Sequence, residues 1–264
     1  QKYKKTSKST KKNVSAGYLF WETSEGYHFK SLDGLLKEKY KKKIIYNETP
    51  SSAGKGIPEG YDLKALTLEV KNTINAQKKF NRGAWTTRNI SFDAFSNEAS
   101  VTVLDAYSEE NQLELAGERL PVPNKAFVKE GPDNNYTRTT WQMISTGQLH
   151  MGKIEEQIEK SKLENFKSGE VVNQAIMRYN QLFSYQITIT VPGEFSLHAG
   201  DTVFMDIPEI SESENKSCAD EVNKEDGGLY IIADLCHYIT AKETYTKLNL
   251  VRDSFGRTGS STGG

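Results

Sequence analysis

Hydrophobic and polar residues alternate most strictly between Ser184 and Val191. One set of positions is apolar and the other is polar: Tyr185, Ile187, Ile189 and Val191 against Gln186, Thr188 and Thr190. A period of two residues is typical of a half-buried β-strand whose second face is polar. Pro192-Gly193 ends this strand, and Leu197–Asp201 predicts the turn into the next one.

Three further strands are predicted after this turn, at Thr202–Ile207, Leu229–Ile239 and Thr244–Val251. Helical spacing precedes them within Met151–Phe183, where Gly169 is the expected break between two helices. The last third of the chain therefore predicts a helix that leads into an all-β region.

A hairpin followed by a short helix is predicted near the N-terminus, within Asn13–Leu36. Aromatic and polar positions alternate from Tyr18 to Thr23, and Ser24-Glu25-Gly26 supplies a polar turn with the glycine that a tight hairpin needs. Ser31 is a candidate N-cap for a helix with Leu32, Leu35 and Leu36 on one face. A strand-like segment, Lys43–Tyr46, follows.

The middle of the chain combines alternating segments with a loop-rich stretch. Leu66, Leu68 and Val70 alternate with polar residues, and a second alternation contains Val101 and Val103. Between them, a glycine in Asn81–Arg88 precedes Ile90-Ser91-Phe92-Asp93. Ser108–His150 contains three prolines in polar surroundings and is interpreted as an insertion.

Both the hairpin region and the last third resemble baseplate hub proteins of contractile-tailed (T-even-like) phages, which share their architecture with the type VI secretion spike protein. The resemblance rests on the order helix, strand, G-x-F-x-L-x-x-G-D turn, strand, long loop, strand, strand. It is carried by Gly193, Phe195, Leu197, Gly200, Gly228-Leu229-Tyr230, His237 and Leu248–Arg252, and by the aromatic hairpin with its Ser-Leu-x-x-Leu segment. It covers about Asn13–Arg257 and is weakest over Leu115–Asn165.

The resemblance implies a structural virion protein, assembled in the host bacterial cytoplasm, without catalytic residues, cofactors or metals. By resemblance it forms a homotrimer between the tail tube, or a tube initiator, above and the trimeric spike below, with baseplate wedge proteins as further candidate neighbours. DNA would be a transient cargo of the channel. The polar positions Gln186, Thr188 and Thr190 are the expected lumen-facing residues. A first barrel is expected in a complete hub protein and is not found in this sequence.

The expected fold is mainly β with minor α: a split antiparallel β-barrel with a small αβ segment and a loop-rich insertion. The predicted divisions are a flexible basic segment 1–12, the αβ segment and linker 13–60, the split tube-type barrel 61–115 and 166–257, the insertion with a helix 116–165, and a flexible Gly/Ser tail 258–264.

Charge and cysteine content narrow the functional classes only slightly. The net charge is −1, so no global basic field indicates nucleic-acid binding, although lysines cluster in Gln1–Lys12 and Lys37–Lys43 and acids in Glu209–Asp226. The two cysteines, Cys218 and Cys236, lack C-x-x-C spacing, which argues against a metal or redox site. A low cysteine content also fits assembly in a reducing compartment. The sequence has no apolar run of membrane-spanning length.

Catalytic motifs are not apparent in the sequence. His28, His150, His198 and His237 are scattered, and Asp234 and His237 would point to opposite faces of one strand. Ala53–Gly56 lacks the surroundings of a phosphate loop, and acidic pairs such as Glu155-Glu156 are interpreted as solvated faces. One alternative is a carbohydrate- or nucleic-acid-binding β-barrel module that uses the aromatic hairpin and the lysine-rich segments, although packed hairpin faces explain the aromatics better. Another is an enzyme whose site is assembled from residues far apart in the sequence.

Overall fold

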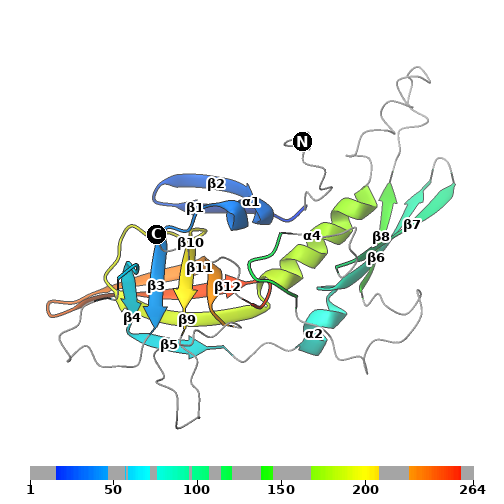
Figure 1. The fold of residues 1–264 in the computed structure, drawn as a ribbon. Helices are drawn as coiled ribbons and strands as arrows, with labels where there is room; N and C mark the ends of the chain where they lie inside the picture. The colour runs from blue at the N-terminus through cyan, green and yellow to red at the C-terminus, as the bar shows by residue number, and fades with distance from the viewer. Residues whose placement is uncertain are drawn as a thin grey trace, which may run out of the picture. The chain divides into compact units, whose positions relative to one another are not determined.

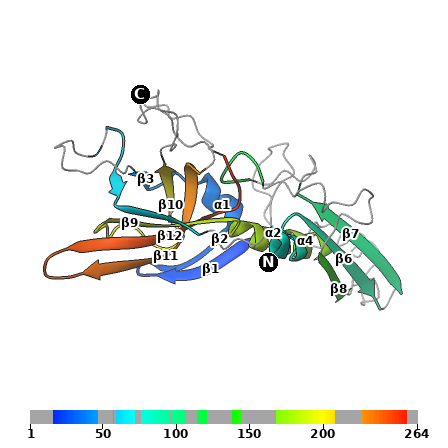
Figure 2. The same ribbon diagram turned by 90° about the horizontal axis from the view of Figure 1, so that it is seen from below.

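A computed structural model describes residues 16–46, 57, 59–71, 76–94, 97–106, 114–120, 138–144, 168–207 and 226–256. The chain divides into two compact units (Figures 1 and 2). The unit that we call the sheet unit comprises residues 1–18, 75–113 and 123–181, and the barrel unit comprises residues 19–74, 114–122 and 182–264. Strands predominate in both, so the predicted mainly β class is confirmed.

The barrel unit is built on a seven-stranded sheet with the order β4-β3-β10-β11-β12-β9-β5. The strands are β3 (Lys42–Tyr46), β4 (Leu63–Ala65), β5 (Thr67–Val70), β9 (Tyr185–Pro192), β10 (Thr202–Asp206), β11 (Gly228–Ile239) and β12 (Thr244–Arg252). Its two edge strands, β4 and β5, follow each other in the chain with only Leu66 between them. The backbone N–H of Leu66 donates to the carbonyl of Thr190 on β9 (2.7 Å). The sheet therefore curls back on itself into a nearly closed barrel.

The sequence predicts a purely antiparallel barrel, and this prediction is wrong, because the barrel contains parallel as well as antiparallel pairings. β3 runs parallel to both β10 and β4, whereas the other pairings are antiparallel. β3 also lies in the segment 13–60, for which the sequence predicts a separate αβ region. Its Ile44 is fully buried in the barrel core. The short segment Lys43–Tyr46 predicts a strand, but its partner β10 lies about 160 residues further along the chain, which local periodicity cannot indicate.

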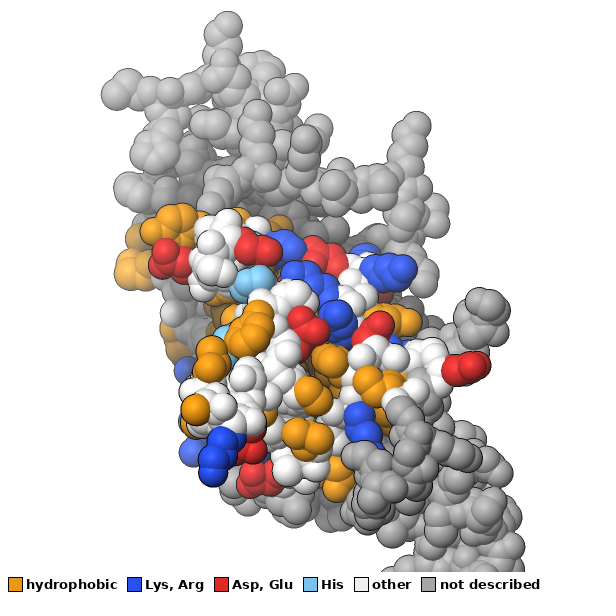
Figure 3. Space-filling model, turned by 90° about the vertical axis from the view of Figure 1, so that its left-hand side faces the viewer, with side chains coloured by type: hydrophobic (Ala, Val, Ile, Leu, Met, Phe, Trp, Pro, Cys, Tyr) orange, Lys and Arg blue, Asp and Glu red, His pale blue; other side chains and the backbone are white. Residues whose placement is uncertain are grey.

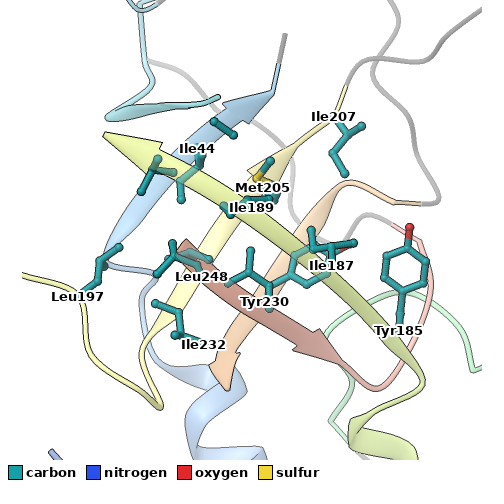
Figure 4. Packing of buried hydrophobic residues seen from close by; sticks show 14 residues of the cluster. Ile44, Tyr185, Ile187, Ile189, Leu197, Met205, Ile207, Tyr230, Ile232 and Leu248 are labelled. Atoms are coloured by element: carbon teal, nitrogen blue, oxygen red, sulfur yellow. The ribbon is translucent and has the colours of Figure 1, made fainter. Parts of the chain in front are cut away.

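The barrel core contains the apolar set predicted for β9. Ile187, Ile189 and Val191 are fully buried and Tyr185 is nearly so. They pack against side chains from the other strands, among them Ile44, Met205, Tyr230, Ile232 and Leu248 (Figure 4). The side-chain alternation of a strand therefore separates a dry interior from a polar exterior, as the sequence predicts.

The hairpin and helix predicted near the N-terminus are present as β1 (Tyr18–Thr23), β2 (Gly26–Ser31) and α1 (Leu32–Lys37). The Ser31 hydroxyl accepts a hydrogen bond from the backbone N–H of Gly34 (3.1 Å), which confirms the predicted N-cap. A second apolar cluster contains Leu32 and Leu35 of α1, Ile231 and Val251 of the barrel, and Leu182. The α1 helix thus covers part of the outer surface of the barrel.

The sheet unit contains a three-stranded sheet, β7-β6-β8, with the helices α2 (Ala76–Asn81) and α4 (Ser168–Leu182). β6 (Thr86–Asp93) pairs with β7 (Glu98–Asp105) and with β8 (Arg138–Ile144). The split barrel is thus realised only in part: β5 pairs with β9 as predicted, but β6 and β7 form their own sheet. The pairing of β6 and β7 could not be predicted, because alternation identifies a strand and not its partner. β8 also replaces part of the predicted loop insertion.

Several predicted features lie outside the described residues. They are the basic segment 1–12, most of the linker 47–60, the residues Ala53–Gly56, the three prolines of the insertion, the helical stretch before Ser168, His150, Cys218, Glu155-Glu156, nearly all of Glu209–Asp226 and the tail 258–264.

Candidate functional site

The outer face of β9 carries the three residues expected to line a channel. In the strand register, Thr188 lies between Glu69 of β5 and Asn249 of β12, and Thr190 lies between Thr67 and Lys247. Asn249 in turn faces Asp234 on β11. The polar positions of four adjacent strands therefore form one continuous surface, which we call the polar face.

Hydrogen bonds connect the polar face across its strands. The Thr188 hydroxyl donates to Asn249 Oδ1 (2.7 Å), and Asn249 Nδ2 donates to Asp234 Oδ1 (2.5 Å). Lys71 Nζ donates to Asn249 Oδ1 (3.4 Å). Thr188 is only 4% exposed, whereas Gln186 and Thr190 are half-buried. This surface offers hydroxyl, amide and charged groups that already bind one another, so it suits a hydrated wall better than a tight ligand site.

The two segments that carry the resemblance to hub proteins contact each other directly. Trp21 on β1 donates its indole N–H to the carbonyl of Ala199 (2.8 Å), in the turn before β10. In the same turn Gly200 has φ of +87°, and a Cβ at Gly200 would lie 2.3 Å from Trp21 Cζ2. Glycine is required here both by the backbone conformation and by the indole ring above it. This contact attaches the hairpin to the barrel.

The lysine run 37–43 is largely paired with acids inside the barrel unit. Lys37 lies 3.1 Å from Glu114, Lys41 2.9 Å from Asp201, Lys42 3.4 Å from Glu194, and Lys43 3.8 Å from Asp206. A hydrogen bond from Ser196 and the charge of Lys42 hold the pKa of Glu194 below its usual value. On the face shown in Figure 3, basic, acidic and hydrophobic side chains are interspersed. The run therefore provides little excess positive charge for a nucleic acid.

The hairpin has one packed face and one exposed face. On the inner face, Trp21 stacks on His28 (5.2 Å between ring centres) and joins the second apolar cluster. On the outer face, Phe20 and Tyr27 stack on each other (6.0 Å) and are 68% and 72% exposed, and Phe29 is 56% exposed. The preferred interpretation, that packing explains all the hairpin aromatics, holds for Trp21 and is wrong for the outer three.

A buried arginine at the end of the barrel was not identified from the sequence. Arg252 is fully buried, and its guanidinium lies 4.7 Å from the ring centre of Tyr230 and 5.1 Å from that of Tyr185. One of its Nη atoms donates to the carbonyl of Gly227 (3.0 Å). Burial raises the pKa of both tyrosines above the ordinary value. The cation is held by ring faces and backbone, an arrangement that stabilises the fold and offers no reactive group to solvent.

The described histidines have structural surroundings. His28 shares a hydrogen bond with Thr23 (2.8 Å), and His237 Nδ1 with the Thr246 hydroxyl (2.9 Å), as predicted for a strand histidine. His198 differs from the expectation of local hydrogen bonding, because its buried Nδ1 lies 3.9 Å from the carboxylates of Glu25 and Asp201 without a hydrogen bond. Among the described residues, no group of three His, Cys, Asp or Glu side chains could hold a metal ion. The described helices also include none that is long and apolar enough to cross a membrane.

Comparison with known proteins supports the sequence-based resemblance. No protein-family model matches the chain. The chain is 23% identical over 249 residues to "Probable baseplate hub protein gp334" of Vibrio phage KVP40, an alignment that covers 93% of this chain and 55% of the phage protein. The resemblance to a phage baseplate hub protein is confirmed.

A solved structure with partial similarity is a tail protein from Neisseria meningitidis MC58. It has 9% sequence identity and a TM-score of 0.41, and the comparison covers 90% of this chain and 52% of that protein. The chain thus spans about half the length of each of these two proteins.

Proposed function

We propose that this chain is a structural subunit of a phage tail baseplate and forms part of its central hub. The observation that carries this proposal is the similarity to a baseplate hub protein over 93% of the chain. The nearly closed barrel with a dry core and a hydrogen-bonded polar exterior is compatible with a wall element whose partners are other subunits.

In the proposed assembly, three copies form a ring that joins the tail tube, or a tube initiator, above to the trimeric spike below, and baseplate wedge proteins are candidate outer neighbours. The polar face, with Gln186, Thr188 and Thr190, lines the channel. Its hydroxyl and amide groups would let DNA pass as a transient cargo, because binding of a polyanion requires uncompensated Lys or Arg charge. The protein would reside in the virion tail after assembly in the host cytoplasm.

Thiol accessibility tests the channel-lining role. In a background in which Cys218 and Cys236 are serine, Thr190→Cys is compared with Ala241→Cys, an exposed position at the β11–β12 turn. In the assembled hub with tube and spike, a small thiosulfonate reagent should label both cysteines, and a maleimide on a bulky carrier should label only position 241. Equal labelling of both positions by the bulky reagent would refute a channel location for the polar face.

The proposed function includes no catalysis. Purified protein is expected not to cleave peptidoglycan, nucleotides or esters, alone or in complex with the spike. Turnover that disappears on substitution of a single Asp or Glu would contradict the structural role.

The exposed outer face of the hairpin keeps one alternative in consideration, a carbohydrate- or nucleic-acid-binding module. Aromatic rings stack on sugars and bases. The paired lysines weaken the nucleic-acid version. Titration of the chain with a single-stranded oligonucleotide or a chito-oligosaccharide tests the alternative, and binding that is lost in Tyr27→Ala would support it.

A further inference from the structure

The three-stranded sheet of the sheet unit has its polar and apolar faces in an unusual arrangement. On one face, which we call the apolar sheet face, two rungs of the register read Val101–Ile90–Trp141 and Ala99–Phe92–Met143. On the opposite face, the two corresponding rungs read Thr102–Asn89–Thr140 and Ser100–Ser91–Gln142. One face is thus apolar and the other polar.

In the three-stranded sheet, the side that carries the polar residues is covered by the chain itself. A Cβ at Gly169, at the start of α4, would lie 3.0 Å from both Asn89 Oδ1 and Thr102 Oγ1, so the helix begins directly against these residues. Asn89 and Ser91 are buried and hydrogen-bonded to each other (2.6 Å), and Gln142 donates to both Ser91 (2.8 Å) and Ser168 (2.9 Å). The residues buried between this sheet and α4 therefore form a hydrogen-bonded polar layer, and the apolar sheet face is not used for this packing.

The apolar sheet face remains accessible to solvent. Val101 is 60% exposed, Val103 51%, Trp141 74% and Met143 75%. Together these side chains expose on the order of 400 Å², a size at which an exposed apolar patch usually marks an interaction site. A single monomer gains nothing from this arrangement, because apolar surface is stabilised by removal from water.

The side chains of the apolar sheet face limit the kinds of partner that could bind there. The next rung reads Val103–Arg88–Thr139, so the face carries one cation at its border, and Arg88 also donates to Thr139 (3.3 Å). A polyanion would find one guanidinium among hydrocarbon, which excludes a nucleic-acid groove. The complementary surface is apolar, of similar size, and has an acid at its edge.

The outer face of the hairpin in the barrel unit has these properties. Phe20, Tyr27 and Phe29 expose three aromatic rings, again on the order of 400 Å². Glu22 is exposed and lies two residues after Phe20, on the same side of β1. Another exposed apolar site, at the end of the β11–β12 hairpin, contains Ile239 but also the exposed charges Lys242 and Glu243.

We propose that the apolar sheet face of one copy binds the outer hairpin face of a second copy, with Arg88 facing Glu22. This inference rests on the proposed hub function, which requires copies of the chain to form a ring. A closed ring is built from heterologous contacts, in which each copy presents two different and complementary patches. The two patches contribute about 800 Å² of apolar area, more than half of the smallest stable interfaces of about 1,200 Å², and a polar rim adds the remainder.

Complementation between two variants of the full chain tests the proposal. The sheet variant carries Trp141→Thr and Met143→Thr, and the hairpin variant carries Phe20→Thr and Tyr27→Thr. These side chains are largely exposed and threonine suits strands, so both variants should fold. Ile239→Thr, at a side chain that is 70% exposed, is the matched control. Circular dichroism checks folding, and light scattering or sedimentation measures the mass.

The wild type and the control should form rings of three copies, and each variant alone should be monomeric. Equimolar mixing of the two variants should yield a one-to-one complex and nothing larger, because only one intact pair of patches remains. A sheet variant that still forms trimers would overturn this inference and leave the hub proposal intact. A hairpin variant that still forms trimers would overturn the hairpin as the complement. A monomeric wild type would overturn both proposals.

Charge reversal tests the orientation. Arg88→Glu and Glu22→Arg should each weaken association by about tenfold or more, as expected for a like-charge contact at an interface. The double variant should recover most of the loss, because every contact of the ring then has both charges reversed. A double variant that associates no better than the weaker single variant would overturn the assigned pair.

Discussion

Replacement of Gly200 by alanine is expected to detach the aromatic hairpin from the barrel. Two costs act together. The residue has φ of +87°, which costs an L-residue about 1 kcal/mol or slightly more. The new Cβ would also lie 2.3 Å from Trp21 Cζ2 and 2.5 Å from Cε2, so the indole must move. Its hydrogen bond to Ala199 is then lost, at about 1 kcal/mol, together with part of its packing. The free energy of unfolding should fall by about 3 kcal/mol in total.

Gly60→Ala is the matched control for this substitution. Gly60 has a similar φ of +84°, but a Cβ there would meet no atom within 4 Å, so only the backbone cost of about 1 kcal/mol applies. Denaturant unfolding followed by circular dichroism gives both free energies, and the fluorescence of Trp21 reports movement of the indole. Equal losses in the two variants, with unchanged tryptophan emission, would refute the clash argument.

Three further predictions follow from the buried groups. Ile187→Ala should lower the free energy of unfolding by about 2–5 kcal/mol, because it empties part of a fully buried core. Thr190→Ala on the outer face should change this free energy by less than about 1 kcal/mol. Similar losses for the two variants in urea unfolding would contradict the assigned faces. Arg252→Lys should destabilise by about 2 kcal/mol or more, since an ammonium cannot spread over two tyrosine rings and reach the Gly227 carbonyl, and a melting temperature equal to that of the wild type would count against this role. Burial, with a smaller effect of Arg82, lowers the pKa of Lys79 to about 8, below the unfolded value of 10.5. Between pH 8 and 10.5 the unfolded chain binds more protons at this site than the folded chain, so the stability of the wild type relative to Lys79→Met should rise with pH across that window. The urea midpoints of both proteins are measured at pH 7.5 and at pH 10. A difference between wild type and variant that is the same at both pH values would exclude the effect.

The local features of the fold could be predicted from the sequence. Alternation with a period of two identified β9 and its apolar and polar faces, because side chains of a strand point alternately to opposite sides. The hairpin turn and the Ser31 cap are likewise set by residues within a few positions of one another. The polar residues of the candidate channel surface were identified for the same reason.

Only the tertiary structure decided which strands pair and which faces are covered. β3 joins β10, β5 completes the barrel beside β9, and β6 binds β8 instead of a barrel strand, because each pairing joins segments far apart in the chain and alternation is the same for any partner. The burial of Arg252 depends on tyrosines from two other strands, and the requirement for Gly200 depends on Trp21, 179 positions earlier. The apolar sheet face is exposed for a similar reason: the sequence shows two different faces, and only the position of α4 determines which of them is left exposed.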